Sequence, residues 1–200
     1  MTVKYNSPVI LTFSLIAAAI MAIETFTPLS IMTYFTVYSK IELADPLWYF
    51  RLFSHVLGHG NWEHFFGNFA LILLVGPILE EKYGSRDILL MIVLTAFITG
   101  LLHVLFFANA GLLGASGIAF MMILLVSFTN AKGGIPLTFI LVVILYLGRE
   151  IMSIFADDQI SQFAHIIGGV LGGAFGFLLE GNNRRKAQKK QKPEKTSTTG

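Results

Sequence analysis

Six long apolar stretches, separated by mostly short links, dominate this chain of 200 residues. A helix needs roughly 20 apolar residues to cross a bilayer core about 30 Å thick, and each stretch comes near that length. The stretches are residues 8–26, 62–79, 88–107, 112–128, 135–151 and 160–179. With 54% hydrophobic residues and a mean hydropathy of +0.70, the chain is far more apolar than a soluble domain. The sequence therefore predicts an all-α membrane protein, a bundle of six transmembrane helices.

The two ends of the chain set the predicted domain boundaries. The last 20 residues hold seven of the fourteen Lys and Arg and are too polar to form a core. We predict a membrane domain over residues 1–180 and a basic disordered cytoplasmic tail over residues 181–200. The first stretch follows Lys4, but it is longer than the apolar core of a signal peptide and lacks a clean cleavage site. We therefore expect it to remain in place as a span.

Basic residues predict which side of the membrane each link faces, because cytoplasmic loops carry the excess of Lys and Arg. Six crossings put both termini on one side. Placing the tail, Lys4, Lys82, Arg86 and Lys132 inside gives eleven basic residues against three outside. Without the tail the margin is four against three, so the tail decides the orientation. We predict a multi-pass protein of the cell membrane with both termini in the cytoplasm.

Polar side chains in three of the stretches fall at one depth. In this topology the second, fourth and sixth stretches run from outside to inside. At about 1.5 Å per residue, His64, Asn68, Ser116 and His165 lie within roughly 10 Å of the outer edge. Strongly polar groups in spans mark functional sites by default, although an interhelical hydrogen bond is the alternative explanation for each one alone. Because these four residues share one depth, a functional site is favoured over separate interhelical hydrogen bonds.

The link over residues 27–61 is the only long one. It carries two prolines, the aromatic run WYF and two histidines, His55 and His59. A link of this length usually has structure or a function of its own. His103 lies near the outer end of the third stretch, so all five histidines are on the predicted outer side.

A ridge of small residues follows His165 in the last stretch. Gly168, Gly172 and Gly176 stand three, seven and eleven residues after it, on one helix face. Such a ridge lets the backbone of another helix approach closely, and ordinary packing is one explanation of it. Because His165 precedes the ridge on the same helix face, close packing along the ridge would also bring its imidazole within reach of a serine on the neighbouring helix.

Ser116 and His165 supply the two groups of a serine hydrolase. A serine hydroxyl is a poor nucleophile until a base takes its proton, and neutral histidine suits that role near pH 7. Gly114 and Gly117 flank the serine and permit close backbone approach. No acidic residue stands at a depth and spacing that clearly orients His165, so the prediction is a Ser/His dyad.

A tetrahedral intermediate also needs donors for its oxyanion. Asn68, His64 and the backbone amide of Ser116 are the candidates, since the first amides of a helix lack internal partners. His64 and Asn68 are four residues apart and share a helix face. We predict no metal and no cofactor: the chain has no cysteine and no H-E-x-x-H motif, and His55, His59 and His64 are a weak ligand set. No nucleic-acid surface is apparent, and the basic tail is more simply a topology determinant or a contact with anionic lipid.

Four sequence motifs occur in order along the chain. They are H-x-x-x-N over residues 64–68, E-x-x-x-G over residues 80–84, G-x-S-G over residues 114–117 and A-H-x-x-G-x-x-x-G over residues 164–172. His55 and His59 precede the first motif at matching positions. By these motifs the chain resembles the rhomboid family of intramembrane serine proteases across roughly residues 45–178.

The resemblance implies a function and a fold. It implies that Ser116 is the nucleophile, that His165 is the general base and that His64 and Asn68 lie in the oxyanion hole. Family members cleave transmembrane proteins near a small residue, in a water-filled cavity open to the outside, without a cofactor. Residues 27–61 would correspond to a loop lying partly in the membrane, and residues 135–151 with the link 153–159 to a mobile gate and cap.

Two positions depart from the family pattern. The Trp-Arg pair of the outer loop is Phe50-Arg51 here, which should keep the Arg contact and lose the indole donor. The Tyr four residues after the serine is Phe120, whose ring can stack on His165 but cannot donate a hydrogen bond.

The predicted function is an intramembrane serine endopeptidase acting on transmembrane substrates. The alternative is a catalytically inactive rhomboid-like protein that binds transmembrane clients. Such proteins typically lack the serine or the histidine, and this chain has both. A channel or transporter would be expected to show polar groups deeper in the spans, where Ser127 is the main exception to an apolar interior.

Overall fold

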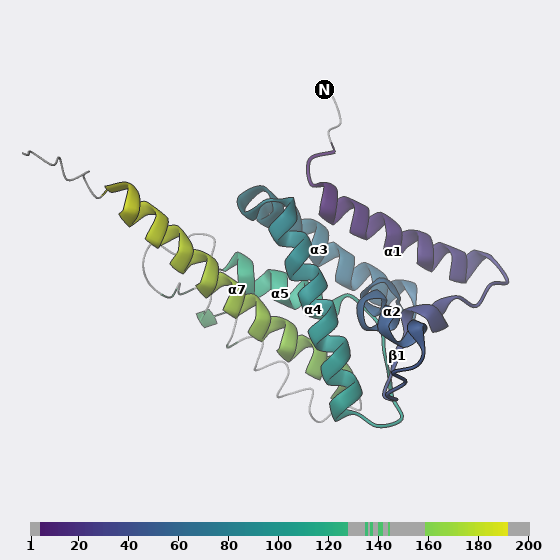
Figure 1. Ribbon diagram of the computed structural model, residues 1–200. Coiled ribbons are helices and arrows are strands. Elements are labelled where there is room, and N and C mark those ends of the chain that lie inside the picture. The colour runs from purple at the N-terminus through teal and green to yellow at the C-terminus, as the bar shows by residue number, and fades with distance from the viewer. Residues whose placement is uncertain are drawn as a thin grey trace, which may run out of the picture.

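The computed structural model describes residues 5–127, residues 159–191 and the single positions 135, 137, 140, 141 and 144 (Figure 1). Within these residues the chain is a bundle of helices with one small pair of strands. The α-helices are α1 (Pro8–Phe26), α2 (Pro46–Ser54), α3 (Trp62–Tyr83), α4 (Ser85–Phe106), α5 (Ser116–Val126) and α7 (Gln159–Gln191). The remaining elements are the 3-10 helices η1 (Met32–Phe35) and η2 (His55–Leu57) and the strands β1 (Val37–Tyr38) and β2 (Gly111–Leu112).

Among the residues that the structure describes, three helices, α1, α3 and α4, are long and apolar enough to cross a membrane. Helix α5 and the stretch 163–179 of α7 are shorter apolar helices. The predicted all-α membrane bundle is therefore confirmed. The fifth predicted span, residues 135–151, and the predicted cap at 153–159 lie outside the described residues, apart from five isolated positions and the backbone of Gln159.

The fourth predicted span begins later than its apolar sequence indicates. Residues 111 and 112 are extended and pair antiparallel with Tyr38 and Val37 of the long link. Gly114 then takes a backbone φ of 120°, which favours glycine, and the helix starts at Ser116 instead of residue 112. Ser116 is thus the first residue of α5, and its amide is among those without a partner inside the helix.

The basic end of the chain also differs from its prediction. Helix α7 continues to Gln191, eleven residues beyond the predicted domain end at residue 180. The backbone of residues 181–191 is therefore helical, although disorder was the expectation from its charge. Arg, Lys, Gln and Ala, which make up most of this stretch, are strong helix formers, so a helical backbone is a favoured conformation for it.

The carboxylate of Glu80, near the end of α3, holds the start of α1. Glu80 is 4% exposed and accepts hydrogen bonds from the backbone N–H groups of Val9 and Ile10, each at 3.0 Å. It also accepts the hydroxyl hydrogen of Ser85, at 2.7 Å, where α4 begins. Helix α1 has no side-chain cap from its own residues, so a residue about 70 positions away satisfies its first amides.

Glu80→Gln is expected to lower the thermal unfolding midpoint of the protein in detergent micelles. An amide presents only one acceptor oxygen, so an N–H group of α1 loses its buried acceptor, at a cost of about 1–3 kcal/mol. Glu81→Gln is the control, because Glu81 is exposed and adjacent in sequence. Equal midpoints for the two variants would contradict this role of Glu80.

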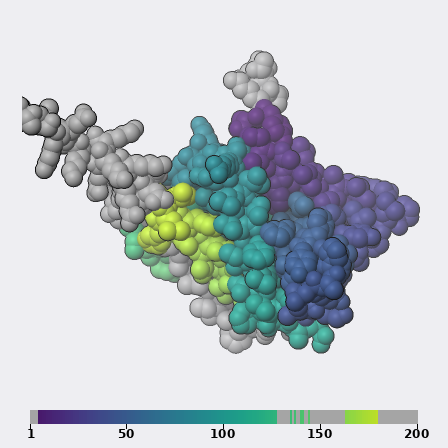
Figure 2. All heavy atoms as spheres, viewed as in Figure 1, coloured from purple at the N-terminus to yellow at the C-terminus, as the bar shows by residue number. Residues whose placement is uncertain are grey.

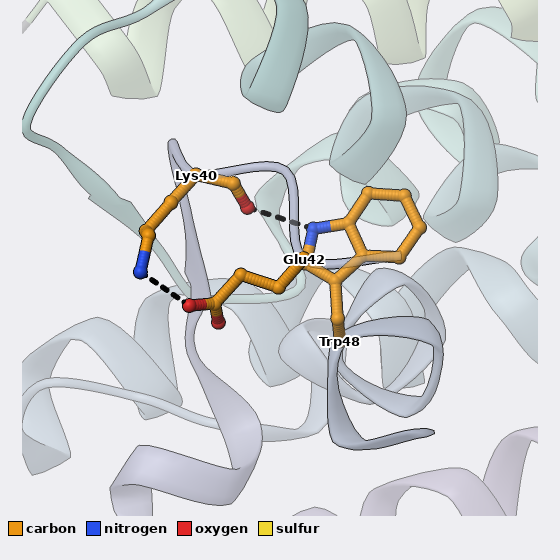
Figure 3. A network of polar contacts seen from close by, with 3 residues as sticks. All are labelled: Lys40, Glu42 and Trp48. Atoms are coloured by element: carbon orange, nitrogen blue, oxygen red, sulfur yellow. Dashed lines mark hydrogen bonds and ion pairs between the residues drawn. The ribbon is translucent and has the colours of Figure 1, made fainter. Parts of the chain in front are cut away.

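The long link has structure of its own, as its length predicts. The indole N–H of Trp48 on α2 donates to the carbonyl of Lys40 at 2.8 Å, and Lys40 forms an ion pair with Glu42 (Figure 3). Helix α2 lies against α4, where a Cβ on Gly100 would come 2.8 Å from the carbonyl oxygen of Leu52. Figure 2 shows the segment that holds α2, in blue, beside the teal surface of α4.

The Phe50-Arg51 pair lies on α2 within this link. The Nε of Arg51 donates to the Thr33 carbonyl at 2.9 Å, so the arginine joins two parts of the link. The Phe50 ring packs on Phe35, with ring centroids 6.1 Å apart, and provides a ring contact in place of an indole donor.

Candidate active site

Helices α5 and α7 touch backbone to backbone through glycines. A Cβ on Gly168 would overlap the carbonyl oxygen of Gly117, and one on Gly172 would overlap that of Met121. Only hydrogen fits at these two positions, as the predicted small-residue ridge requires. His165 stands one turn before Gly168 and Ser116 directly precedes Gly117, so the two residues lie at the same level of adjacent helices.

Phe120 brings the imidazole of His165 against α5. The two ring centroids are 4.3 Å apart with an interplanar angle of 42°. Phe120 stands one turn after Ser116 on the same helix, and both side chains are 8% exposed. The phenyl ring thus packs on the imidazole without supplying a hydrogen bond.

A cavity of about 500 Å³ opens beside these residues. Its lining combines His64 and Asn68 of α3, Phe120 of α5 and His165 of α7, with Glu63 and Leu71 around them. The cavity is roomy and polar enough to hold water molecules. Three helices far apart in sequence therefore contribute side chains to one polar space.

The loop before Ser116 lies directly against His64 and Asn68. A Cβ on Gly114 would come 2.6 Å from Cε1 of His64 and 3.7 Å from Nδ2 of Asn68. The N–H of Gly114 donates to the carbonyl of His55 at 2.9 Å, which anchors the loop to the long link. Glycine at this position leaves room for the His64 ring beside the start of α5.

His59 is a site residue to which the sequence analysis gave no role. Its Nε2 accepts hydrogen bonds from Nδ2 of Asn68 at 3.1 Å and from the N–H of Ala115 at 3.3 Å. It is 1% exposed, and burial, with His64 nearby as a smaller cause, lowers its pKa from 6.5 to about 4. His59 is therefore neutral at pH 7, with a lone pair that orients both groups.

Acidification is expected to destabilise the protein in part through His59. Below pH 6.5 the histidine of the unfolded chain takes up a proton, whereas the folded one resists until its pKa of about 4. Stability is thus lost progressively as the pH falls between these values. Burial also lowers the pKa of His55 to about 4, which adds to the effect. Thermal midpoints at pH 7 and pH 4.5 should differ less for His59→Leu than for the wild type, and equal differences would contradict the assignment.

The other two outer histidines tie the long link to the bundle. Nδ1 of His55 lies 3.3 Å from the Arg51 carbonyl, and its Nε2 lies 3.4 Å from the Thr99 hydroxyl. Nε2 of His103 lies 3.3 Å from both the Ser39 hydroxyl and the Ala110 carbonyl. In the part of the chain that the structure describes, no three His, Asp or Glu side chains are grouped to hold a metal ion.

Comparisons with known proteins show to which family the chain belongs. A family model described as the Rhomboid domain matches residues 47–182, more than half of the chain and all of the cavity lining. RHOMBOID-like protein 4 of Arabidopsis thaliana is 27% identical in a match of 148 residues, and the match covers 70% of this chain and 36% of that protein. The chain thus spans little more than a third of this relative's length. By its sequence and its helical bundle, the chain belongs to the rhomboid family.

Proposed function

We propose that this chain is an intramembrane serine endopeptidase that cleaves transmembrane proteins with a Ser116/His165 dyad. The observation that carries the proposal is the close contact of α5 and α7. Glycine-to-backbone packing and a ring separation of 4.3 Å between Phe120 and His165 bring an imidazole beside the start of α5. Acyl transfer by a serine requires a base within reach of its hydroxyl, and the contact of α5 and α7 brings His165 to the level of Ser116.

The proposed reaction has two halves. In the first, the Ser116 oxygen attacks the carbonyl carbon of the substrate peptide bond while His165 accepts the hydroxyl proton. The imidazolium then gives this proton to the leaving amine as the C–N bond breaks, and an acyl ester remains on Ser116. In the second half, a water molecule attacks the ester with His165 again as base, which releases the carboxyl product and restores the serine.

The negative oxygen of each tetrahedral intermediate needs hydrogen-bond donors. We assign this role to Asn68, His64 and the amide of Ser116, because the first two lie against the loop that precedes the serine. His59 accepts one hydrogen of the Asn68 amide, which leaves the second Nδ2 hydrogen for the oxyanion. A single donor of this kind contributes about 10²–10³ to the rate. Gly114 supports the site by making room for His64.

The cavity supplies the water for the second half-reaction. Its volume of about 500 Å³ and its polar side chains suit several water molecules beside His165. With both termini in the cytoplasm, as the basic tail predicts, the cavity would open toward the outside. No cofactor enters the proposal, because side chains and backbone supply the nucleophile, the base and the oxyanion donors.

Cleavage of a reporter by the purified full-length chain in proteoliposomes tests the proposal. The reporter is a single transmembrane helix with a small residue near its outer end, and the readout is the appearance of two fragments. The proposal predicts fragments that accumulate with time. Stable binding of the reporter without any fragment would contradict it and would favour the client-binding alternative.

A further inference from the structure

A second cavity lies on another face of the bundle, between α1 and α4. This α1–α4 groove has a volume of about 460 Å³ and shares no lining residue with the active-site cavity. Pro8 and Ile16 of α1, Phe53 and Leu57 of the long link, and Leu89 and Val93 of α4 are among its walls. Nearly every wall is hydrocarbon, and the hydroxyl of Thr12 is paired with that of Tyr5 at 2.9 Å.

The groove exists because α1 packs on α3 more closely than on α4. A Cβ on Gly76 of α3 would come 2.7 Å from Cδ1 of Ile10, so α1 presses its buried face onto α3. The α1 residues toward α4 remain open, and Ile16 is 45% exposed. Val93 on the opposite wall is 39% exposed. On the face shown in Figure 2, purple α1 and teal α4 meet above the blue segment of α2.

One end of the groove lies at the level of lipid headgroups. Glu80 binds both the first amides of α1 and the first residue of α4, so both helices begin at this end. The groove follows α4 from Leu89 to Ala96. This stretch is about 10 Å of helix, within one leaflet of about 15 Å. Phe53 and Leu57 of the long link add to the lining. The groove thus has a length that suits an acyl chain within one leaflet.

Charge at the open end identifies the kind of occupant. Arg86 is exposed. It precedes Leu89 by three residues and Val93 by seven, so it lies on the same face of α4 as these two groove residues, nearer the start of the helix. No ion pair joins Arg86 to a carboxylate among the residues that the structure describes. Asp87 lies on the same face of α4 as Leu90, three residues later, and Leu90 is not part of the groove lining. Tyr5 before α1 is a residue type typical of the headgroup level.

We infer that the α1–α4 groove binds one phospholipid, with an acyl chain in the slot and the headgroup phosphate on Arg86. An apolar slot headed by an exposed guanidinium matches a molecule with a phosphate at one end and a hydrocarbon chain at the other. Arg binds phosphate through paired N–H donors, and a net negative headgroup adds attraction. The site therefore prefers phosphatidylglycerol to phosphatidylcholine, which has the same phosphate but a neutral headgroup.

Native mass spectrometry of the full-length protein tests this inference with two pairs of variants. The protein is loaded with a mixture of phosphatidylglycerol and phosphatidylcholine, washed in detergent and examined for retained lipid. Val93→Trp fills the groove from α4, and Leu90→Trp places the same bulk on the same helix outside it. Ile16→Trp and Leu15→Trp form the equivalent pair on α1, so a folding defect in one variant does not decide the result.

The expected result is one retained phospholipid in the wild type and in both control variants. Retention should fall at least tenfold in Val93→Trp and Ile16→Trp. Arg86→Gln should remove the preference for phosphatidylglycerol, whereas Lys82→Gln should keep it. Equal retention in the groove and control variants would overturn the inference. So would loss of reporter binding with unchanged lipid retention in the groove variants, because the groove would then hold a substrate helix.

Discussion

Replacement of Ser116 by alanine is expected to lower the rate of reporter cleavage by at least about 10³-fold. The variant lacks the oxygen that forms the acyl ester, and the loss of a catalytic serine removes nearly all of the rate that the nucleophile and base provide together. The substitution also removes little packing, because alanine retains the Cβ at this site, which is 8% exposed. Initial rates in proteoliposomes, with equal amounts of folded protein, measure the effect.

Ser127→Ala is the matched control for this prediction. Ser127 follows the last residue of the same helix, and its hydroxyl donates to the Ile123 carbonyl at 3.0 Å, away from the cavity lining. Cleavage by this variant should stay within about twofold of the wild type, because the half-buried Ser127 hydroxyl bonds to a carbonyl of its own helix, away from the cavity lining. Cleavage by Ser116→Ala within tenfold of the wild type would exclude this serine as the nucleophile.

Gly168→Ala is expected to lower kcat/KM by at least about 10²-fold although it adds only one methyl group. The new Cβ would overlap the Gly117 carbonyl, which is backbone and cannot rotate away, so α7 must move off α5. His165 stands one turn earlier on α7 and moves with it. A misplacement of about 1 Å between reacting groups is enough for an effect of this size. Overpacking should also cost about 1–3 kcal/mol of stability.

Gly67→Ala separates this steric effect from the intrinsic effect of the substitution. Gly67 is also within a helix, but a Cβ there would meet nothing within 4 Å. Its thermal midpoint should stay unchanged or rise, because alanine favours helix over glycine by about 1 kcal/mol. A Gly168→Ala protein as stable and as active as the wild type would show that α5 and α7 do not need the close contact.

Local sequence patterns were sufficient to propose most residues of the candidate site. The spacing of His64 and Asn68, the glycines around Ser116 and the glycine ridge after His165 each follow from the period of one helix. Apolar length likewise predicts α1, α3 and α4, which the structure contains as long apolar helices. In each case the decisive information lies within about 20 consecutive residues, which is why the sequence alone could supply it.

Contacts between distant segments could not be predicted in this way. Glu80 accepts hydrogen bonds from backbone amides 70 and 71 residues away, and the sequence around Val9 and Ile10 does not indicate which residue will be the acceptor. His59 acquires its role only when Asn68 and Ala115 meet at its ring. The late start of α5 has the same origin, because the predicted span begins at residue 112 but that residue pairs with a strand of the long link.

The most direct test of the central claim is to find where a fluorophosphonate attaches to the purified protein. Such a reagent forms a stable bond with a serine only when a neighbouring base activates it. Peptide mapping by mass spectrometry should place the adduct on Ser116 in the wild type and find none in folded His165→Ala. An adduct on Ser116 that persists in His165→Ala, or the absence of any adduct on Ser116 in the wild type, would contradict the Ser116/His165 dyad.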